Sequence, residues 1–424
     1  MDSTARGARA ARATRPARPP VRPVRPVIRL TGTPRPDRPV VTELRLSAFK
    51  SHRGAVIPLG PLTLLTGASG SGKTSALLAY EALARLGAGA ALGRAFPDPA
   101  GCVPERAAAD AQGRRGFRIG CTADGPAGPV RLDLAVQAEP QLRVVGERLT
   151  GGDGRTLLTT ALRDPGRRVV HAEWHTAGAA PVTRAPLPDD RLATALLPLR
   201  VAGKTEGQLR VLAAAEQMVV ALRSVFPCDP QPHRMREPVA KGEGRLRRGC
   251  DNLAEVLHRT RDDCPRRHAR LAALARAGCA GPVRDVRVEE LADGTVRAVL
   301  GRDAVRDAAG AAGGAAGGVR PAGTPLGRLG DGELRYLALA LVLLTGPGVL
   351  AVDQAAEVPG AMQALTVLAD GLDRGLDGRQ ARELTGLAAA ICAEGHIRLI
   401  GTVGETGAQA ARECDGVTVV HLRP

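Results

Sequence analysis

The chain has few aromatic side chains and few lysines. Four Phe, two Tyr and one Trp make up 2% of its 424 residues, and four lysines stand among 59 basic residues. Base stacking on exposed rings, as in RRM and OB-fold proteins, is therefore not expected. The eight cysteines form no C-x-x-C pair and no zinc-type spacing. This pattern indicates free, mostly buried thiols in a reducing compartment.

Long apolar runs are also missing from the sequence. No segment has the uninterrupted apolar length of a membrane span, and none resembles the apolar region of a signal peptide. We therefore expect a cytoplasmic protein without a membrane partner. A chain of 424 residues is long enough to bury a core and to form two or three domains.

The positive charge is concentrated at the N-terminus. Residues 1–39 carry ten Arg against two Asp, a net of +8, which is half of the formal +16 of the chain. Interleaved prolines prevent a helix there, so the segment is predicted to be a disordered basic tail. One interpretation is sequence-independent attraction to the phosphates of DNA, and the other is a solvated extension without a partner.

One segment has a specific phosphate-binding pattern, G-x-x-x-x-G-K-[ST]. The apolar run 62–65 precedes it as an expected strand, and an expected helix over 75–86 follows it, which is the context that a P-loop requires. Its glycines let backbone N–H groups surround phosphates, its lysine reaches the β- and γ-phosphates, and its threonine hydroxyl ligates Mg²⁺. The predicted site for ATP and Mg²⁺ comprises Gly67, Ala68, Ser69, Gly70, Ser71, Gly72, Lys73 and Thr74.

Strands and helices are expected on both sides of a poorly patterned middle region. Residues 151–188 show no clear period and are expected to be irregular, and residues 308–318 are a flexible loop of Ala and Gly. Expected strands cover 40–49, 130–138 and 141–149, with a hairpin over 286–291 and 295–300. Expected helices cover 206–225, 252–261 and 266–277.

The last hundred residues predict a parallel α/β layer that packs with the P-loop strand. Helices are expected over 334–344 and 379–393, and strands over 349–352, 397–402 and 417–422. The strand 349–352 is followed by Asp353, the Walker B form, in which the carboxylate holds Mg²⁺ through water. We expect the tail at 1–39, an N-terminal lobe at 40–150, a largely helical insertion at 151–324 and a C-terminal lobe at 325–424.

A third motif, LGDGELR at 329–335, lies about twenty residues before Asp353 and opens a helix, where ABC-type ATPases carry their signature. With the three motifs in this order, the chain resembles the AAA-type ATP-binding proteins of the SMC/RecF/OLD-like branch of ABC-type ATPases. Residues 49–51 resemble that family's FKS, and residues 251–257 resemble its G-x-N-L-A-x-V-L helix.

The resemblance implies an α/β P-loop NTPase fold: a two-lobed ABC-type ATPase head with antiparallel strands and a helical insertion between Walker A and the signature. It also implies a head-to-tail homodimer that closes on ATP. Gly330, Gly332 and Glu333 would then contact the nucleotide held by the partner's P-loop. Importer and exporter ATPases separate these motifs by roughly a hundred residues, whereas 257 separate Lys73 from Gly330 here.

Three departures from the family pattern affect hydrolysis. Gln354 follows Asp353 where the family has a water-activating Glu, and an amide cannot accept that proton. Thr402 is followed by Val403 where a histidine is expected, and Gly330 replaces the signature serine. These departures predict slow hydrolysis of ATP with retained ATP binding. Glu357 is an alternative base toward the attacking water.

Two functions remain open at the sequence level. One is an ATPase head linked to DNA maintenance or phage defence, and the other is a catalytically degenerate, ATP-dependent regulatory or scaffold subunit that controls a protein partner. Gln137 is a guess for the Gln-bearing loop of such heads. His171 and His175 are spaced as in H-E-x-x-H, but the Glu is displaced and no helical pattern surrounds them, so a strand is preferred to a metal site.

Overall fold

The computed structural model describes residues 37–175, 182–302, 323–352, 359–360 and 363–423. Its contacts separate residues 1–34 from a second compact unit, 35–424, to which all of the described residues belong. Almost all of the expected basic tail and the whole Ala/Gly segment lie outside these ranges. No helix within them is long and apolar enough to cross a bilayer.

The larger sheet is antiparallel and has eight strands in the order β2-β1-β4-β5-β6-β7-β8-β9. Leu132, Leu134 and Val136 are buried and alternate with more exposed residues, as expected for a half-buried strand. Residues 151–188 were expected to be irregular, and this prediction is wrong, because three of the strands lie there. The bounds are β1 Val40–Phe49, β2 His52–Pro58, β4 Arg115–Asp124, β5 Val130–Glu139, β6 Arg143–Thr150, β7 Thr156–Ala161, β8 Val169–His175 and β9 Val182–Pro188.

Helix α4 (Glu206–Arg223) packs on the inner face of this sheet. The Thr205 side chain accepts a hydrogen bond from the Gln208 N–H and so caps the start of the helix. Its buried Val211, Ala215 and Met218 join the core that the sheet forms with α1 (Lys73–Gly87). The helix predicted over 206–225 is therefore confirmed, and it ends two residues early because β10 begins at Val225.

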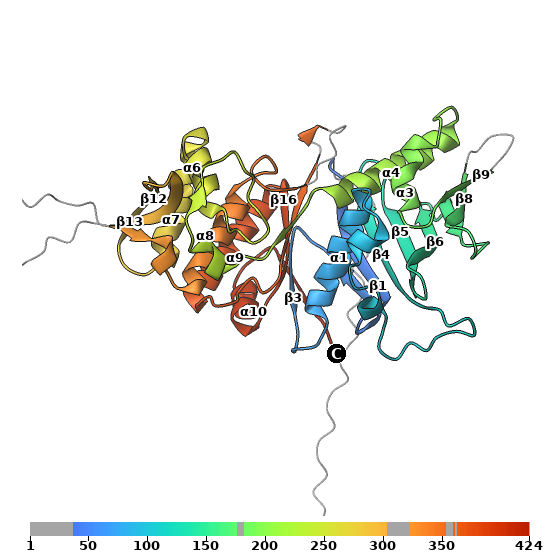
Figure 1. Ribbon diagram of the computed structural model, residues 1–424, viewed down its shortest axis with the longest axis horizontal. Coiled ribbons are helices and arrows are strands. Elements are labelled where there is room, and N and C mark those ends of the chain that lie inside the picture. Colours follow the sequence, from blue (N-terminus) through green and yellow to red (C-terminus); the bar gives the residue numbers. More distant parts are fainter. Residues whose placement is uncertain (1–36, 176–181, 303–322, 353–358, 361–362, 424) are drawn as a thin grey trace, which may run out of the picture. The chain divides into compact units, whose positions relative to one another are not determined.

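The second sheet is parallel and has five strands in the order β10-β15-β16-β3-β17. Leu64 and Leu399 face a core that includes α8 and α9, whereas Leu65 and Ile400 face the core that includes α1. The sheet thus lies between α1 on one face and α8 and α9 on the other (Figure 1). The bounds are β3 Leu62–Thr66, β10 Val225–Cys228, β15 Leu365–Ala369, β16 Ile397–Thr402, β17 Val417–His421, α8 Asp331–Leu344 and α9 Gly378–Ala393.

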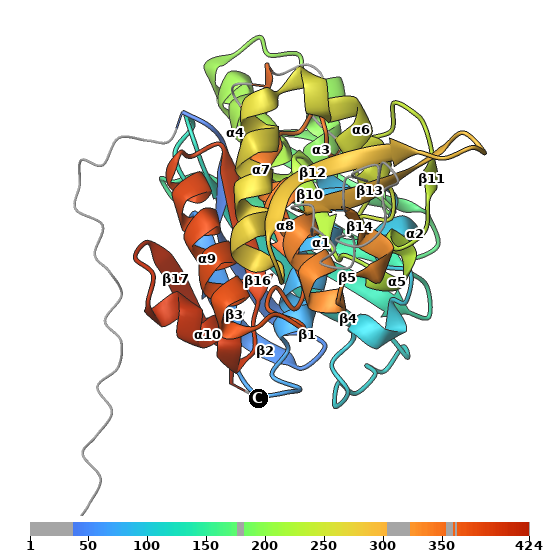
Figure 2. The same cartoon turned by 90° about the vertical axis from the view of Figure 1, so that its left-hand side faces the viewer.

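A third, smaller sheet joins β12 (Val283–Glu290) and β13 (Thr295–Arg302) as the predicted hairpin, with β11 (Val239–Ala240) and β14 (Gly323–Pro325) beside β13. Helix α7 (Pro265–Gly278) packs on β12 and beside α8 and α9 (Figure 2). The remaining elements are α2 Leu92–Ala95, η1 Ala100–Cys102, α3 Ala193–Leu196, η2 Leu197–Leu199, α5 Pro232–Met235, α6 Leu253–Asp263, η4 Leu326–Arg328 and α10 Glu405–Arg412.

One predicted strand is not a strand of either large sheet. Within 349–352 only Leu350 forms a bridge, an isolated parallel one with Leu246. The strand between β10 and β16 is instead β15, which the sequence analysis did not predict. All five of its residues are buried, which fits a central strand of a parallel sheet. The other strands predicted for this layer, 397–402 and 417–422, are confirmed as β16 and β17.

Candidate nucleotide-binding site

The loop between β3 and α1 has the backbone conformation of a phosphate cradle. Gly67, Gly70 and Gly72 all have positive φ angles, 141°, 82° and 86°, a region that favours glycine. A Cβ on Gly67 would also collide with the Leu422 carbonyl oxygen at the end of β17. Gly72 occupies the N-cap position of α1, where no side chain caps the helix and no acidic residue lies in the first turn. The first N–H groups of α1 are therefore available to an anion.

Two polar side chains of this loop fit a phosphate ligand. The Lys73 ammonium donates to the carbonyl oxygens of Gly67 and Ala68, at 2.7 and 3.0 Å, so it lies folded over the loop. The Ser71 hydroxyl is buried and has no hydrogen-bond partner among the described residues. A buried hydroxyl without a partner is costly unless a ligand satisfies it.

The loop is supported from behind by a histidine that the sequence analysis did not single out. His52, the first residue of β2, is 5% exposed, and its Nε2 lies 2.9 Å from the Gly72 carbonyl oxygen. A Cβ on Gly72 would collide with this ring. The start of the strand after the Phe49-Lys50-Ser51 segment thus packs against the last turn of the loop, and Ser51 itself also lies close to Gly72.

A carboxylate at the end of β15 faces the P-loop threonine. The Thr74 hydroxyl lies 3.2 and 3.1 Å from the two carboxylate oxygens of Asp370, to which it donates. The Thr402 hydroxyl at the end of β16 donates to the same carboxylate at 2.7 Å and accepts from the Gly371 N–H at 2.7 Å. Adjacent parallel strands end at the same edge of a sheet, so these groups converge there.

This arrangement offers a second candidate for the metal-binding carboxylate. Asp370 follows a strand of the five-stranded sheet and contacts Thr74, whereas residues 349–352 are outside that sheet. Asp353, Gln354 and Glu357 lie outside the described residues, so their roles as metal ligand and water-orienting groups stay predictions. A carboxylate beside a hydroxyl is an oxygen donor set of the kind that Mg²⁺ prefers. Thr74 and Asp370 would hold that ion.

Gly371 stands directly after Asp370. It has a φ of 62° and no side chain that could accept a proton. Val403, which follows Thr402, is 3% exposed, and its N–H donates to the Leu65 carbonyl oxygen. The residues directly after Asp370 and Thr402 thus carry no side chain that titrates.

The residues of the expected signature lie at the start of α8. Gly330 is the N-cap, and the Glu333 carboxylate accepts from the Gly330 N–H at 3.0 Å and from the Ala280 N–H at 2.7 Å. Gly332 packs against the Gly375 carbonyl, with no room for a Cβ. Within the described residues, no hydrogen bond or ion pair joins Gly330, Gly332 or Glu333 to the P-loop of the same chain. The predicted contact of these residues with a nucleotide held by a second chain is not tested.

Arg335 connects α8 to the turn after β15. This side chain is buried and donates to the Pro230 carbonyl oxygen at 2.7 Å and to those of Gly371 and Asp370 at 3.2 and 3.5 Å. Asp229 lies 3.7 Å from its guanidinium. Burial, followed by the neighbouring positive charge of Arg374, lowers the pKa of Arg335 below its ordinary value. Helix α8 and the turn that follows β15 are therefore joined through one buried cation.

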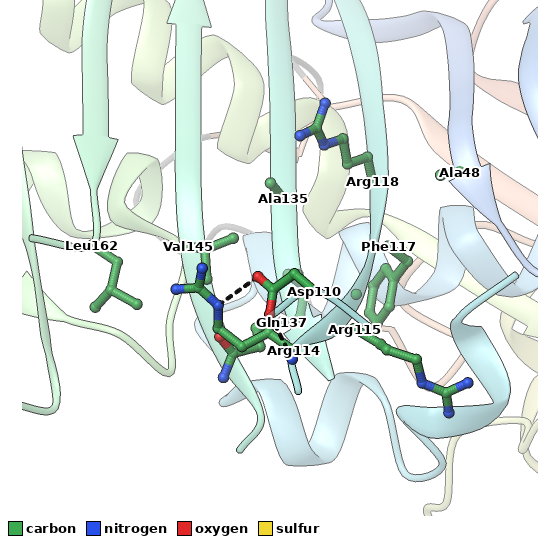
Figure 3. Close-up of a pocket in the computed structure, with 12 residues that line it drawn as sticks. Ala48, Asp110, Arg114, Arg115, Phe117, Arg118, Ala135, Gln137, Val145 and Leu162 are labelled. Carbon is green, nitrogen blue, oxygen red and sulfur yellow. Dashed lines mark hydrogen bonds and ion pairs between the residues drawn. The ribbon is translucent and has the colours of Figure 1, made fainter. Parts of the chain in front are cut away.

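A pocket of about 460 Å³ lies away from the P-loop, on the outer face of the eight-stranded sheet (Figure 3). Gln137 lines this pocket together with Arg114, Arg115 and Arg118, and its amide donates to the Gln141 carbonyl oxygen at 3.0 Å. None of the residues that line the pocket belongs to the P-loop. The guess that Gln137 is the Gln-bearing loop residue gains no support from this placement.

The preference for a strand at the histidine pair is confirmed. His171 and His175 lie on β8, and the described residues hold no group of three or more His, Cys, Asp or Glu side chains that is suited to a metal ion. All eight cysteines are free, with six of them buried.

The comparisons with known proteins are as follows. Neither a protein-family model nor a curated protein matches the chain. Similar solved structures include an SMC head bound to the C-terminal winged-helix domain of ScpA, with 12% identity, 88% of this chain and 92% of the other covered, and a TM-score of 0.43. The SMC head domain of Thermotoga maritima has 12% sequence identity to this chain, with 88% of this chain and 92% of the other covered and a TM-score of 0.38. A third similar structure is an SMC head domain of Pyrococcus furiosus with an extended coiled coil, bound to the C-terminal domain of ScpA. It has 12% sequence identity to this chain, with 91% of this chain and 94% of the other covered and a TM-score of 0.42. Values this low do not establish a family for the chain.

Proposed function

We propose that the chain binds ATP with Mg²⁺ at the loop 67–74, as an ABC-type ATPase head. The observation that carries this proposal is the contact of the Asp370 carboxylate with the Thr74 hydroxyl, 3.1 Å, at the edge of a parallel sheet. Glycine conformations, an open helix N-terminus and an unpartnered Ser71 hydroxyl support the phosphate site. Oxygen donors suited to Mg²⁺ support the metal site. When bound, the metal neutralises phosphate charge.

Turnover of ATP and water to ADP and phosphate is expected to be slow. The residue after Asp370 is a glycine, and the residue after Thr402 is a buried valine. A missing general base typically costs about two to four orders of magnitude in rate. The chain is then better suited to switching between nucleotide-bound and nucleotide-free states than to rapid hydrolysis.

ATP-dependent pairing of two copies is part of the proposal. Gly330 and Asp331 are exposed at the start of α8, and the Gly330 position carries no side chain that would block a second chain. Asp331 is paired with Arg236 at 2.5 Å, which reduces its repulsion of a phosphate. A head-to-tail homodimer would place these groups against the nucleotide of the partner, as the family resemblance implies.

Such a head could serve either as an ATPase linked to DNA maintenance or phage defence or as a regulatory or scaffold subunit for a protein partner. One observation favours the first role. Arg118 and Arg148 on the outer sheet face have no hydrogen bond or ion pair within the described ranges, whereas Arg131 nearby is paired with Asp133. Exposed arginines on an open surface are suited to contacts with nucleic-acid phosphates. The absence of titratable groups after Asp370 and Thr402 favours the alternative, a regulatory subunit for a protein partner.

Replacing Lys73 by Ala tests nucleotide binding. The variant removes the only side-chain charge that the loop offers to phosphates, so we expect MgATP affinity in calorimetry to fall by about 2–5 kcal/mol, or at least about 30-fold. Lys204→Ala, which removes an exposed lysine before α4, is the matched control and should bind as wild type does. Unchanged binding by Lys73→Ala would contradict the proposed site.

Phosphate release, measured with and without duplex DNA, separates the two roles. Stimulation of a slow basal rate by DNA supports the DNA-linked head. A rate that stays slow in both conditions, with nucleotide binding intact, supports the regulatory subunit.

A further inference from the structure

We propose that Arg374 binds the terminal phosphate of the nucleotide and makes the site selective for a triphosphate over a diphosphate. This inference rests on the proposed binding of ATP at the loop 67–74. Arg374 lies in the turn between β15 and α9, and its own N–H donates to the Gly371 carbonyl oxygen at 3.0 Å. The short turn holds the side chain next to the residue that follows Asp370.

The guanidinium occupies the space in which a side chain of residue 371 would begin. A Cβ built on Gly371 would lie 2.9 Å from Arg374 Nε, 3.1 Å from Nη2 and 3.2 Å from Cζ. The guanidinium plane therefore packs directly on the glycine backbone, which has a φ of 62°. A side chain at position 371 would have to displace it. The Arg374 guanidinium can therefore occupy this place only because residue 371 has no side chain.

Hydrogen bonds connect this position to the expected metal site. The Gly371 N–H donates to the Thr402 hydroxyl at 2.7 Å, and that hydroxyl donates to Asp370 at 2.7 Å. Asp370 in turn accepts from Thr74, the hydroxyl that begins the first turn of α1 with Lys73. The Arg374 guanidinium therefore packs on the residue next to the carboxylate that faces the P-loop. Lys73 and Arg374 would contact phosphate oxygens from two different elements.

The charge of Arg374 is not neutralised within the part of the chain that the structure describes. No carboxylate there forms an ion pair or hydrogen bond with its guanidinium, and the side chain is exposed. The buried guanidinium of Arg335 donates to the carbonyl oxygen of the same Gly371. Two cations thus flank one glycine. Asp229 lies 3.7 Å from Arg335, whereas the other nearby carboxylates, Asp370 and Asp373, accept from other donors. A phosphate oxygen would give the Arg374 guanidinium an anionic partner.

The chemistry of a guanidinium at this position differs from that of a carboxylate. A guanidinium remains protonated in proteins and cannot accept a proton from water, but it presents several N–H donors to phosphate oxygens in a fixed plane. It therefore stabilises the bound triphosphate instead of activating water. A diphosphate lacks the group that Arg374 would contact, so the contribution of Arg374 should appear for ATP and vanish for ADP.

The test is calorimetric titration of Arg374→Ala with MgATP and with MgADP. We expect ATP affinity to fall about tenfold or more, as for a charge-assisted hydrogen bond, while ADP affinity changes by less than about threefold. Arg374→Lys should recover part of the loss, because a point charge keeps the attraction without the planar fork. Arg412→Gln, an exposed arginine that pairs with Glu405 on α10, is the matched control and should leave both affinities unchanged.

The outcomes distinguish this inference from the proposed function. If wild type binds neither nucleotide, the nucleotide site itself is wrong. If wild type binds both but Arg374→Ala loses ATP and ADP affinity equally, or loses neither, the proposed phosphate contact is wrong and the nucleotide site stands. A selective loss of ATP affinity with an unchanged thermal transition would support the contact.

Discussion

Changing Asp370 to Asn should remove the Mg²⁺ dependence of ATP binding and leave the fold intact. The amide keeps an oxygen that can accept from the hydroxyls of Thr74 and Thr402, which lie 3.1 and 2.7 Å from the carboxylate. Only the negative charge is removed. The variant therefore tests an electrostatic role with little change in packing.

The expected magnitude follows from these distances. A divalent cation and a single carboxylate charge at a separation of about 4 Å would interact by about 8 kcal/mol at an effective dielectric constant of about 20. Desolvation of the ion and of the carboxylate offsets much of this energy. We expect a net loss of about 2–3 kcal/mol, which corresponds to a weakening of MgATP binding by about 30- to 150-fold.

The assay is calorimetric titration of ATP in Mg²⁺ and in EDTA, on wild type, Asp370→Asn and Asp353→Asn. Wild type and Asp353→Asn should both bind more tightly with Mg²⁺, whereas Asp370→Asn should bind with nearly the same affinity in both buffers. The reverse result, with Mg²⁺ dependence lost only in Asp353→Asn, would refute the assignment to Asp370. It would restore the position that the sequence alone predicts.

Elements that depend on local patterns were predicted well from the sequence. Residues 397–402 and 417–422 are apolar runs with clear ends, and they form β16 and β17. The P-loop needs glycines at fixed offsets between a strand and a helix, and the structure places positive φ angles at Gly67, Gly70 and Gly72. Short-range requirements of this kind are fully contained in the sequence.

The contact of Asp370 with Thr74 was not predicted, because two apolar runs compete for the same role. Residues 349–352 and 365–369 both end immediately before an aspartate. The difference lies in strand pairing, since β15 pairs with both β10 and β16, whereas Leu350 only bridges Leu246. Pairing across more than a hundred residues, as between β10 and β15, leaves no local trace in either run.

The strands of residues 151–188 were missed for a different reason. Val170, Ala172 and Trp174 are buried and alternate with less buried residues, so β8 carries the period of a half-buried strand. Its neighbour β9 has two prolines and an arginine among seven residues, which suits an edge strand but weakens the sequence signal.

Two predictions concern the rest of the described chain. Arg335→Met should lower the free energy of unfolding by about 3 kcal/mol, because it leaves the carbonyl oxygens of Pro230, Asp370 and Gly371 without their buried donor, whereas Arg412→Gln should change it by less than about 0.5 kcal/mol in urea titrations. If the outer sheet face binds duplex DNA, replacing Arg118 and Arg148 by Ser should make the slope of log K against log salt less steep by about 1.8, because each phosphate that an arginine neutralises contributes about 0.9. Removing residues 1–34, which carry eight arginines, should reduce the slope further, by about 3.6 if half of them contact phosphates. Equal slopes for wild type and both variants on two unrelated duplexes would mean that neither the face nor the tail contacts DNA. The regulatory role would then be the one that remains, because phosphate contacts cannot be lost without a change in counterion release.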